Sequence, residues 1–305
     1  MALRKILRSV PATKGGPIFR LVGSVDFKGQ GINHPIEAVD PVILLDYSGE
    51  FSGKGLPAFG FHPHSGLIAN TIVIEGSFYD EDNLTGRSEA LNETGDIYLV
   101  SAGKGVAHAE ATATEGPHKA IQLICKIPYD KMDLEPEICK VKSSQIPVLD
   151  IEGQGQIKVL VGKLGDLVSP ATLKAYPEKV TIGRALVNPG AKMEVVLDPE
   201  LEHGVVFALD GKGKVVDEST FATIDEALDT VVFGSGEKLV LENEDSNKIL
   251  DVFFTASKPL NEEWKKLKGF NGFFIAPTEA EAEKIYAKIE EVGVQNFTHK
   301  VWNNQ

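Results

Sequence analysis

Residues 60–76 have the sequence GFHPHSGLIANTIVIEG, which places two histidines, His62 and His64, directly before an apolar run. Alternate residues of a β-strand point to the same side of a sheet, about 6.5 Å apart, so the pair directs two imidazoles into one volume. Pro63 removes one donor from the strand ladder, which is tolerated at an edge or at a strand end. The stretch predicts a short strand with two metal ligands, followed by an apolar strand.

A second stretch, residues 94–110, reads TGDIYLVSAGKGVAHAE and places His108 and Glu110 in the same alternation after a glycine-rich bend. If the two strands are neighbours, four side chains converge. Three neutral imidazoles and one carboxylate leave a divalent ion with one net positive charge and, in an octahedral geometry, two open positions. Such sites suit iron, manganese, nickel or copper, whereas structural zinc sites are closed and usually rich in thiolates. The pattern predicts a metal site for catalysis or ligand sensing.

The rest of the chain consists largely of short β-rich runs separated by turn-forming residues, which is typical of an all-β protein. Strands are predicted at residues 41–47, 70–80, 95–100 and 119–128, and again at 157–164, 179–187, 192–197, 204–216 and 238–243. The order strand, acid-glycine turn, strand occurs in both halves and indicates two copies of one β-sandwich or barrel. A helix is predicted only near the end, where Thr278 and Glu281 form a capping box and Gly293 stops the periodicity.

The predicted fold is therefore all-β, with two antiparallel β-sandwiches or barrels and a C-terminal helix. Residues 1–128 form the metal-binding barrel, and residues 129–156, with proline, acids and little periodicity, form the connection. Residues 157–305 form a second barrel that lacks metal ligands, because only His203 lies near its equivalent turn.

Composition excludes several classes of protein. The length of 305 residues fits one large or two medium domains, and the net charge of −13 disfavours direct nucleic-acid contact and anionic membrane surfaces. The sequence contains no apolar run of about 20 residues, so it predicts no membrane span. The two cysteines, Cys125 and Cys139, lack metal or redox spacing, which favours the cytoplasm. A nuclear location is compatible with this, and the five basic residues before Asp26 make a mitochondrial presequence the minor alternative.

The two histidine stretches resemble the pirin family of the cupin superfamily, in which H-x-H and A-G-x-G-x-x-H-x-E hold one metal ion. The similarity extends to DPVILLDYSGEF (40–51), AIQLICKIP (120–128) and FNGFFIAPTEAEAEKIYAKIEEV (270–292). The resemblance implies a bicupin fold, with two cupin-type antiparallel β-barrels and a C-terminal helix. It also implies Fe(II), with Mn, Ni, Cu or Zn as alternatives, at His62, His64, His108 and Glu110.

Pirin-like proteins are associated with quercetin 2,3-dioxygenase activity, in which a flavonol is cleaved with loss of carbon monoxide. The resemblance therefore implies an Fe(II)-dependent dioxygenase of a small aromatic hydroxy-keto substrate, with Glu110 also as the catalytic residue that accepts the substrate's hydroxyl proton. The alternative is a non-catalytic, iron-containing, redox-sensing regulator that binds a protein partner. A cupin isomerase or sugar-binding protein ranks last, because no Lys or Arg lies between Gly55 and Ser77 to hold a phosphate.

Among the departures from the family pattern, which include Ala111 and Thr112 in place of Met-Pro after the second motif, two remove charged groups. The family has arginine directly after H-P-H and glutamate three residues later, where this chain has Ser65 and Ile68. We expect their loss to make the pocket mouth less polar and quercetinase activity weak or absent. Cys125 alternates with apolar residues and is predicted to be a core thiol.

Overall fold

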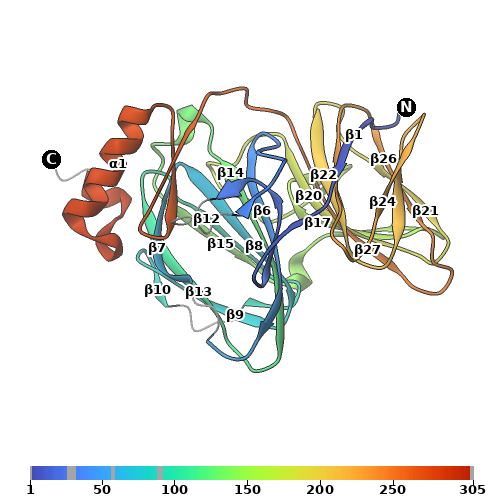
Figure 1. Ribbon diagram of the computed structural model, residues 1–305, viewed down its shortest axis with the longest axis horizontal. Helices are drawn as coiled ribbons and strands as arrows, with labels where there is room; N and C mark the ends of the chain where they lie inside the picture. The colour runs from blue at the N-terminus through green and yellow to red at the C-terminus, as the bar shows by residue number, and fades with distance from the viewer. Residues whose placement is uncertain (1, 26–31, 56–58, 88–91, 303–305) are drawn as a thin grey trace.

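A computed structural model describes residues 2–25, 32–55, 59–87 and 92–302 of the chain. Two β-sandwiches lie side by side, and one helix covers the outer end of the first (Figure 1). The prediction of an all-β fold with a C-terminal helix is confirmed. The strands pair into open sheets that face each other, rather than into continuously paired closed barrels.

The first sandwich has two sheets whose facing sides enclose a cavity. One sheet has the order β15-β12-β8-β14-β6-β3-β2. Its strands are β2 (Thr13–Gly15), β3 (Ile18–Val22), β6 (Val42–Ser52), β8 (Leu67–Glu75), β12 (Ile97–Ser101), β14 (Pro117–Lys126) and β15 (Glu137–Val141). The other has the order β10-β9-β13-β7-β29-β28, with β11 paired to β9. Its strands are β7 (Phe59–Ser65), β9 (Ser77–Asp82), β10 (Gly86–Arg87), β11 (Asn92–Glu93), β13 (Val106–Thr112), β28 (Lys265–Gly269) and β29 (Gly272–Ala276).

The second sandwich repeats the architecture with an apolar interior. Its larger sheet has the order β1-β25-β22-β27-β20-β17-β16 and its smaller sheet the order β21-β26-β23-β24. The larger sheet contains β1 (Ile6–Val10), β16 (Val148–Ile151), β17 (Gly155–Val161), β20 (Val180–Val187), β22 (His203–Asp210), β25 (Thr230–Phe233) and β27 (Leu250–Ser257). The smaller contains β21 (Lys192–Val196), β23 (Gly213–Val216), β24 (Phe221–Ile224) and β26 (Lys238–Asn243). Two short hairpins complete the strands, β4 (Ser24–Val25) with β5 (Ile32–Asn33) and β18 (Lys163–Leu164) with β19 (Leu167–Val168).

Both ends of the chain cross to the far half of the molecule. Strand β1 pairs with β25 in the second sandwich, and the hairpin β28–β29 returns to the first, where β29 lies parallel to β7. The segment 129–156 holds β15, which joins the first sandwich, and β16, which joins the second, together with the 3-10 helices Tyr129–Lys131 and Ser143–Gln145. The division at residues 1–128, 129–156 and 157–305 stays a prediction.

The C-terminal helix, α1 (Glu279–Val292), begins and ends as the sequence predicts. The Thr278 hydroxyl accepts a hydrogen bond from the backbone N–H of Glu281, and Gly293 is the C-cap. Ile289 packs with Phe274 of β29 and with Phe297 of the segment after the helix. The helix therefore seals the outer side of the returning hairpin. No helix in the described residues has the length and apolar composition needed to cross a membrane.

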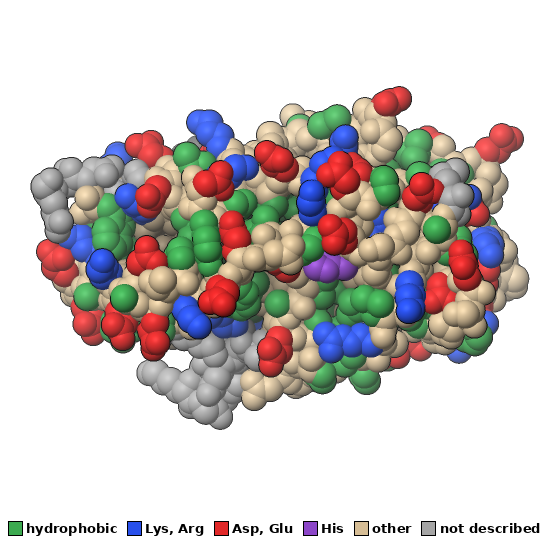
Figure 2. Space-filling model, turned by 90° about the horizontal axis from the view of Figure 1, so that it is seen from above, with side chains coloured by type: hydrophobic (Ala, Val, Ile, Leu, Met, Phe, Trp, Pro, Cys, Tyr) green, Lys and Arg blue, Asp and Glu red, His purple; other side chains and the backbone are tan. Residues whose placement is uncertain are grey.

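Charged side chains are mixed over the molecular face in Figure 2, where acidic, basic and hydrophobic groups alternate. The net charge of −13 is therefore not gathered into one acidic patch on this face.

Asp96 ties the turn before β12 to the segment after β15. Its carboxylate accepts hydrogen bonds from the backbone N–H of Glu93 at 2.9 Å, the backbone N–H of Ser143 at 2.7 Å and Nζ of Lys142 at 2.7 Å. Burial opposes ionisation, but these hydrogen bonds outweigh it and hold the pKa of Asp96 below its usual value.

We expect Asp96→Asn to lower the free energy of unfolding by about 1–3 kcal/mol at neutral pH, because it weakens hydrogen bonds to a buried charge. A lowered folded-state pKa contributes stability above the unfolded-state pKa of about 3.9, and this stability is lost as pH falls through the folded value. Urea unfolding at a series of pH values should show wild type and variant converging in acid. The exposed Asp150 gives the control, since Asp150→Asn should change little at any pH. A loss of stability in Asp96→Asn that does not depend on pH would contradict this account.

Candidate metal centre

Three histidines from two paired strands meet inside the first sandwich. His62 and His64 lie on β7, and His108 lies opposite His62 on β13. The ring centroids are 4.8 Å apart for His62 and His64, 4.6 Å for His62 and His108, and 5.0 Å for His64 and His108. One ligand atom from each ring lies within 4.8 Å of the other two. The structure thus brings three of the four predicted ligands together.

Burial and hydrogen bonding prepare these imidazoles for a metal. Burial lowers the pKa of all three, which keeps them neutral and able to coordinate. Nδ1 of His62 lies 2.9 Å from the carbonyl oxygen of Gly60, and Nδ1 of His64 lies 3.4 Å from that of Phe273. Because a carbonyl oxygen can only accept a hydrogen bond, Nδ1 carries the hydrogen in both rings. Nε2 therefore has the free lone pair that can bind a metal.

His108 supplies the test of whether a metal fits. Both of its ring nitrogens are buried and have no hydrogen-bond partner. Buried polar atoms nearly always have a partner, so an unpaired imidazole beside two others is best explained by a ligand that all three share. Three neutral imidazoles suit a divalent transition metal. Among the described residues, no second group of three or more His, Cys, Asp or Glu side chains is arranged in this way.

Glu110 lies outside the histidine group. It faces the same cavity, but its Oε1 accepts a hydrogen bond from the Thr71 hydroxyl at 2.6 Å. The register of β13 against β7 shifts between His108 and Glu110, because two residues of β7 lie opposite one residue of β13. Strand β13 itself pairs with β9 without a shift, so His108 and Glu110 share a face, and it is the hydrogen bond to Thr71 that turns the Glu110 carboxylate away from the histidines. The role of Glu110 as a fourth ligand stays a prediction, and it requires the carboxylate to turn from Thr71 towards the histidines.

Glu110, Thr71 and Gln122 form a connected polar chain. Thr71 Oγ1 also lies 2.9 Å from Oε1 of Gln122, although its hydroxyl has one hydrogen to donate. A protonated Glu110 that donates to Thr71 satisfies both contacts, because the Thr71 hydroxyl can then donate to Gln122. This agrees with the effect of burial, which exceeds that of the Thr71 hydrogen bond and raises the pKa of Glu110 to about 7.

Gly66 allows the returning strand β29 to close on the histidine strand. Its φ of +68° lies in the left-handed region, and a Cβ at this position would lie 2.1 Å from the carbonyl oxygen of Ile275. Only glycine fits such a turn against a neighbouring backbone. Strand β7 is consequently not an edge strand, and its pairing with β29 begins at His64, one residue after Pro63.

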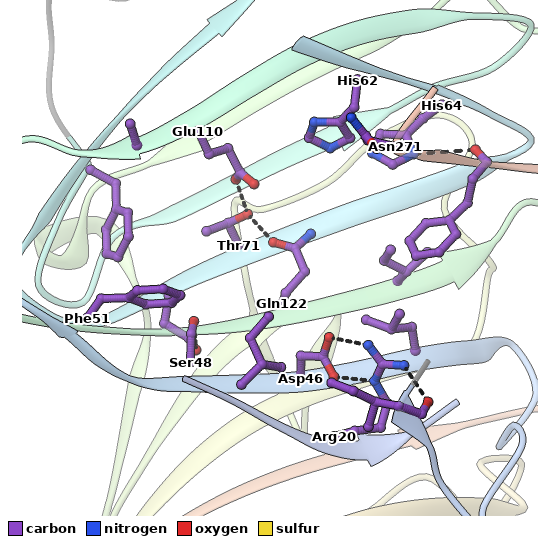
Figure 3. A pocket seen from close by; sticks show the side chains of 18 residues that line it. Arg20, Asp46, Ser48, Phe51, His62, His64, Thr71, Glu110, Gln122 and Asn271 are labelled. Atoms are coloured by element: carbon purple, nitrogen blue, oxygen red, sulfur yellow. Dashed lines mark hydrogen bonds and ion pairs between the residues drawn. The ribbon is translucent and has the colours of Figure 1, made fainter. Parts of the chain in front are cut away.

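The cavity beside the histidines has a volume of about 220 Å³ (Figure 3). Its walls are mainly apolar, with polar groups at two places. Apolar side chains line it from both sheets: Ile18, Ile32, Leu44, Phe51, Phe78, Ala111, Ala120, Ile124 and Phe273. The polar lining consists of Arg20, Asp46, Ser48, His62, His64, Thr71, Glu110, Gln122 and Asn271.

The sequence interpretation missed the Arg20–Asp46 ion pair and Asn271. The ion pair had a signal, since each charge stands alone in an apolar strand, in IFRLVG (18–23) and VILLDY (42–47). The position of Asn271 in the cavity had none, because it depends on the return of β28 and β29 to the first sandwich.

The expectation that Ser65 and Ile68 set the polarity of the pocket is wrong. Neither lines the cavity, because Ser65 alternates with His64 and points to the other side of β7. Ser65 instead borders a separate cavity near Lys104, and Ile68 is buried in the core. The structure thus removes the stated reason for weak quercetinase activity. Cys125 is fully buried in that core, as predicted for a core thiol.

Known proteins resemble the chain in both sequence and structure. Residues 25–124 match the family model described as Pirin. A pirin-like protein of Arabidopsis thaliana is 27% identical over 226 residues, which cover 74% of this chain and 79% of that protein. Quercetin 2,3-dioxygenase from Acinetobacter baumannii superposes with a TM-score of 0.75 at 21% identity and covers 95% of this chain and 98% of its own. A bacterial pirin of Escherichia coli in complex with nickel(II) gives a TM-score of 0.59 at 15% identity, over 84% of this chain and 98% of its own.

Proposed function

The chain belongs to the pirin family of the cupin superfamily, and on this premise we propose that it is a metal-dependent dioxygenase of the quercetin 2,3-dioxygenase type. One observation carries the proposal. Three buried, neutral imidazoles converge at an apolar cavity, and one of them has no other partner for its nitrogens.

His62, His64 and His108 would hold the metal, and Glu110 would complete the set after a side-chain rotation. Fe(II) is our first choice, with Mn, Ni, Cu or Zn as alternatives that the same donors accept. The bound ion would supply Lewis acidity towards a hydroxy-keto substrate and a site for dioxygen.

The remaining lining fits a planar aromatic substrate. Phe51, Phe78 and Phe273 present apolar rings to the cavity, against which an aromatic ring can pack. Glu110 would accept the proton of the substrate's hydroxyl group, and its pKa of about 7 before metal binding is close to that of an effective general base at neutral pH. Thr71 would hold the Glu110 carboxylate for this step when Glu110 acts as the base without binding the metal.

The alternative is a non-catalytic, iron-containing regulator with a protein partner. Such a protein needs no cavity for a small molecule at its metal, whereas this chain has one. The mixed charges of the face in Figure 2 also offer no single-sign surface there to a charged partner. These observations support the enzyme over the regulator.

The test is to purify the protein without chelator, measure its metal by mass spectrometry, and follow oxygen uptake and carbon monoxide release with flavonols. We expect one metal ion per chain and flavonol-dependent oxygen uptake in the iron-loaded protein. Stoichiometric metal with no oxygen uptake, for any flavonol and for each of the candidate metals, would exclude the proposed activity.

A further inference from the structure

A buried ion pair lies across the cavity from the histidines. Arg20 on β3 is the cross-strand neighbour of Asp46 on β6. Nε of Arg20 donates to one carboxylate oxygen, and Nη2 donates to the other at 2.7 Å. The Arg20 side chain is 3% exposed and the Asp46 side chain 12% exposed. In Figure 3 the pair faces His62 and His64 from the opposite wall.

Stability alone gives little reason for this ion pair. Removing two charges from water has a large desolvation cost, and apolar residues of similar volume often replace a buried pair without loss of stability. Apolar residues would fit at these two positions, because the surrounding cavity wall includes Ile18, Leu44 and Ile124. A charged pair in this place therefore calls for a role in the cavity.

The donors and acceptors of Arg20 and Asp46 that the ion pair does not use indicate which ligand it can bind. Each carboxylate oxygen of Asp46 uses one acceptor site for Arg20 and retains another, while Nη1 of Arg20 has two N–H groups and reaches the Ile32 carbonyl at 3.3 Å. A hydroxyl group both donates and accepts, so it can bind the two partners at once. A carboxylate could accept from Arg20, but it has no hydrogen to donate and would leave the remaining acceptor sites of Asp46 unsatisfied, and an alkyl group would bury the pair without compensation.

We propose that the Arg20–Asp46 pair determines specificity by recognising a phenolic hydroxyl on the substrate ring remote from the metal. The inference rests on the proposed function and names its substrate class. The substrate is a planar aromatic hydroxy-keto compound with a neutral hydroxyl at its far end, and an unsubstituted or carboxylated ring is disfavoured.

The test compares three ligands on the zinc-loaded protein, because zinc permits binding without redox turnover. The ligands are 3-hydroxyflavone and two derivatives with one further hydroxyl, either on the fused benzo ring or on the pendant phenyl ring. A hydrogen bond to a charged group corresponds to about ten- to hundredfold in affinity. By calorimetry, we expect the derivative that reaches the pair to bind tighter than 3-hydroxyflavone by that factor, and a carboxylate in place of its hydroxyl to abolish the gain.

The double variant Arg20→Met/Asp46→Leu replaces both charges with apolar groups of similar size. We expect it to fold and to bind all three flavonols within about twofold of one another, since the charged group is gone. The matched control is Arg184→Met/Asp251→Leu. This pair makes the same two-pronged contact between β20 and β27, away from the cavity, and its removal should preserve the discrimination.

The outcomes separate the inference from the proposed function. Equal affinity of the three ligands for the unmodified protein overturns the inference and leaves the function standing, and this result does not depend on any variant folding. Discrimination that survives in a folded Arg20→Met/Asp46→Leu protein overturns it as well. If no flavonol binds the metal-loaded protein, the proposed function fails and the inference fails with it.

Discussion

Replacing His62 by alanine is expected to abolish stoichiometric metal binding, together with any flavonol-dependent oxygen uptake. The change leaves two imidazoles of the three that converge in the first sandwich. Loss of groups that merely orient a ligand costs about 10–100-fold in metal affinity, so the loss of a ligand should exceed about a hundredfold. Metal per chain, measured after dialysis against metal-free buffer, gives the result directly.

His203→Ala is the control for this variant. His203 belongs to β22 of the second sandwich, outside the histidine group, and its imidazole contacts the Asp40 carbonyl. This variant should retain its metal, and circular dichroism should show that both variants are folded. Full metal occupancy in His62→Ala would show that the metal site has been misplaced.

Glu110→Gln is expected to lower the rate of oxygen uptake by about 10²–10⁴-fold, the usual contribution of a general base. Glutamine keeps the size of the side chain and a carbonyl oxygen for Thr71, but it cannot take the substrate's proton. Metal content should fall less than in His62→Ala, because all three imidazoles remain. Stopped-flow oxygen consumption and metal analysis on the same sample separate the two roles of Glu110.

Thr71→Val is the companion variant, since it removes the hydroxyl that binds Glu110 and keeps the shape of the side chain. We expect a smaller loss of rate than in Glu110→Gln, with metal content unchanged. If Glu110→Gln alters neither rate nor metal content, both of its predicted roles are wrong.

The histidine group could be predicted because each pair of residues lies within one short stretch of sequence. The two-residue period of a strand fixes that His62 and His64 share a face, and the same holds for His108 and Glu110. The orientation of the Glu110 side chain could not be predicted, because it depends on a hydrogen bond to Thr71 of β8, in the facing sheet. The motif fixes the face of the strand on which Glu110 lies, but not the group on the opposite sheet that it contacts.

The far wall of the cavity could be predicted only in part: the lone charges of Arg20 and Asp46 in apolar runs are a signal, but their meeting at the cavity is not. Arg20, Asp46 and Asn271 come from three strands or turns that are far apart in the chain and meet only through sheet order. The sequence predicts a strand at residues 41–47, within β6, but it does not show which face of that strand looks towards the histidines. The parallel pairing of β29 with β7 has no local signature at all.

The return of β29 has a consequence for biosynthesis. His64 and the Phe273 carbonyl that contacts its ring are 209 residues apart in the chain. At about 5–20 residues per second, roughly 10–40 s separate their synthesis on the ribosome. The nascent N-terminal half therefore presents its three histidines before the strand that orients one of them exists. We expect the His64 ring to reach its final orientation only after β29 has been made, so a chain that ends before Phe273 should keep the three histidines but lack the carbonyl contact to His64.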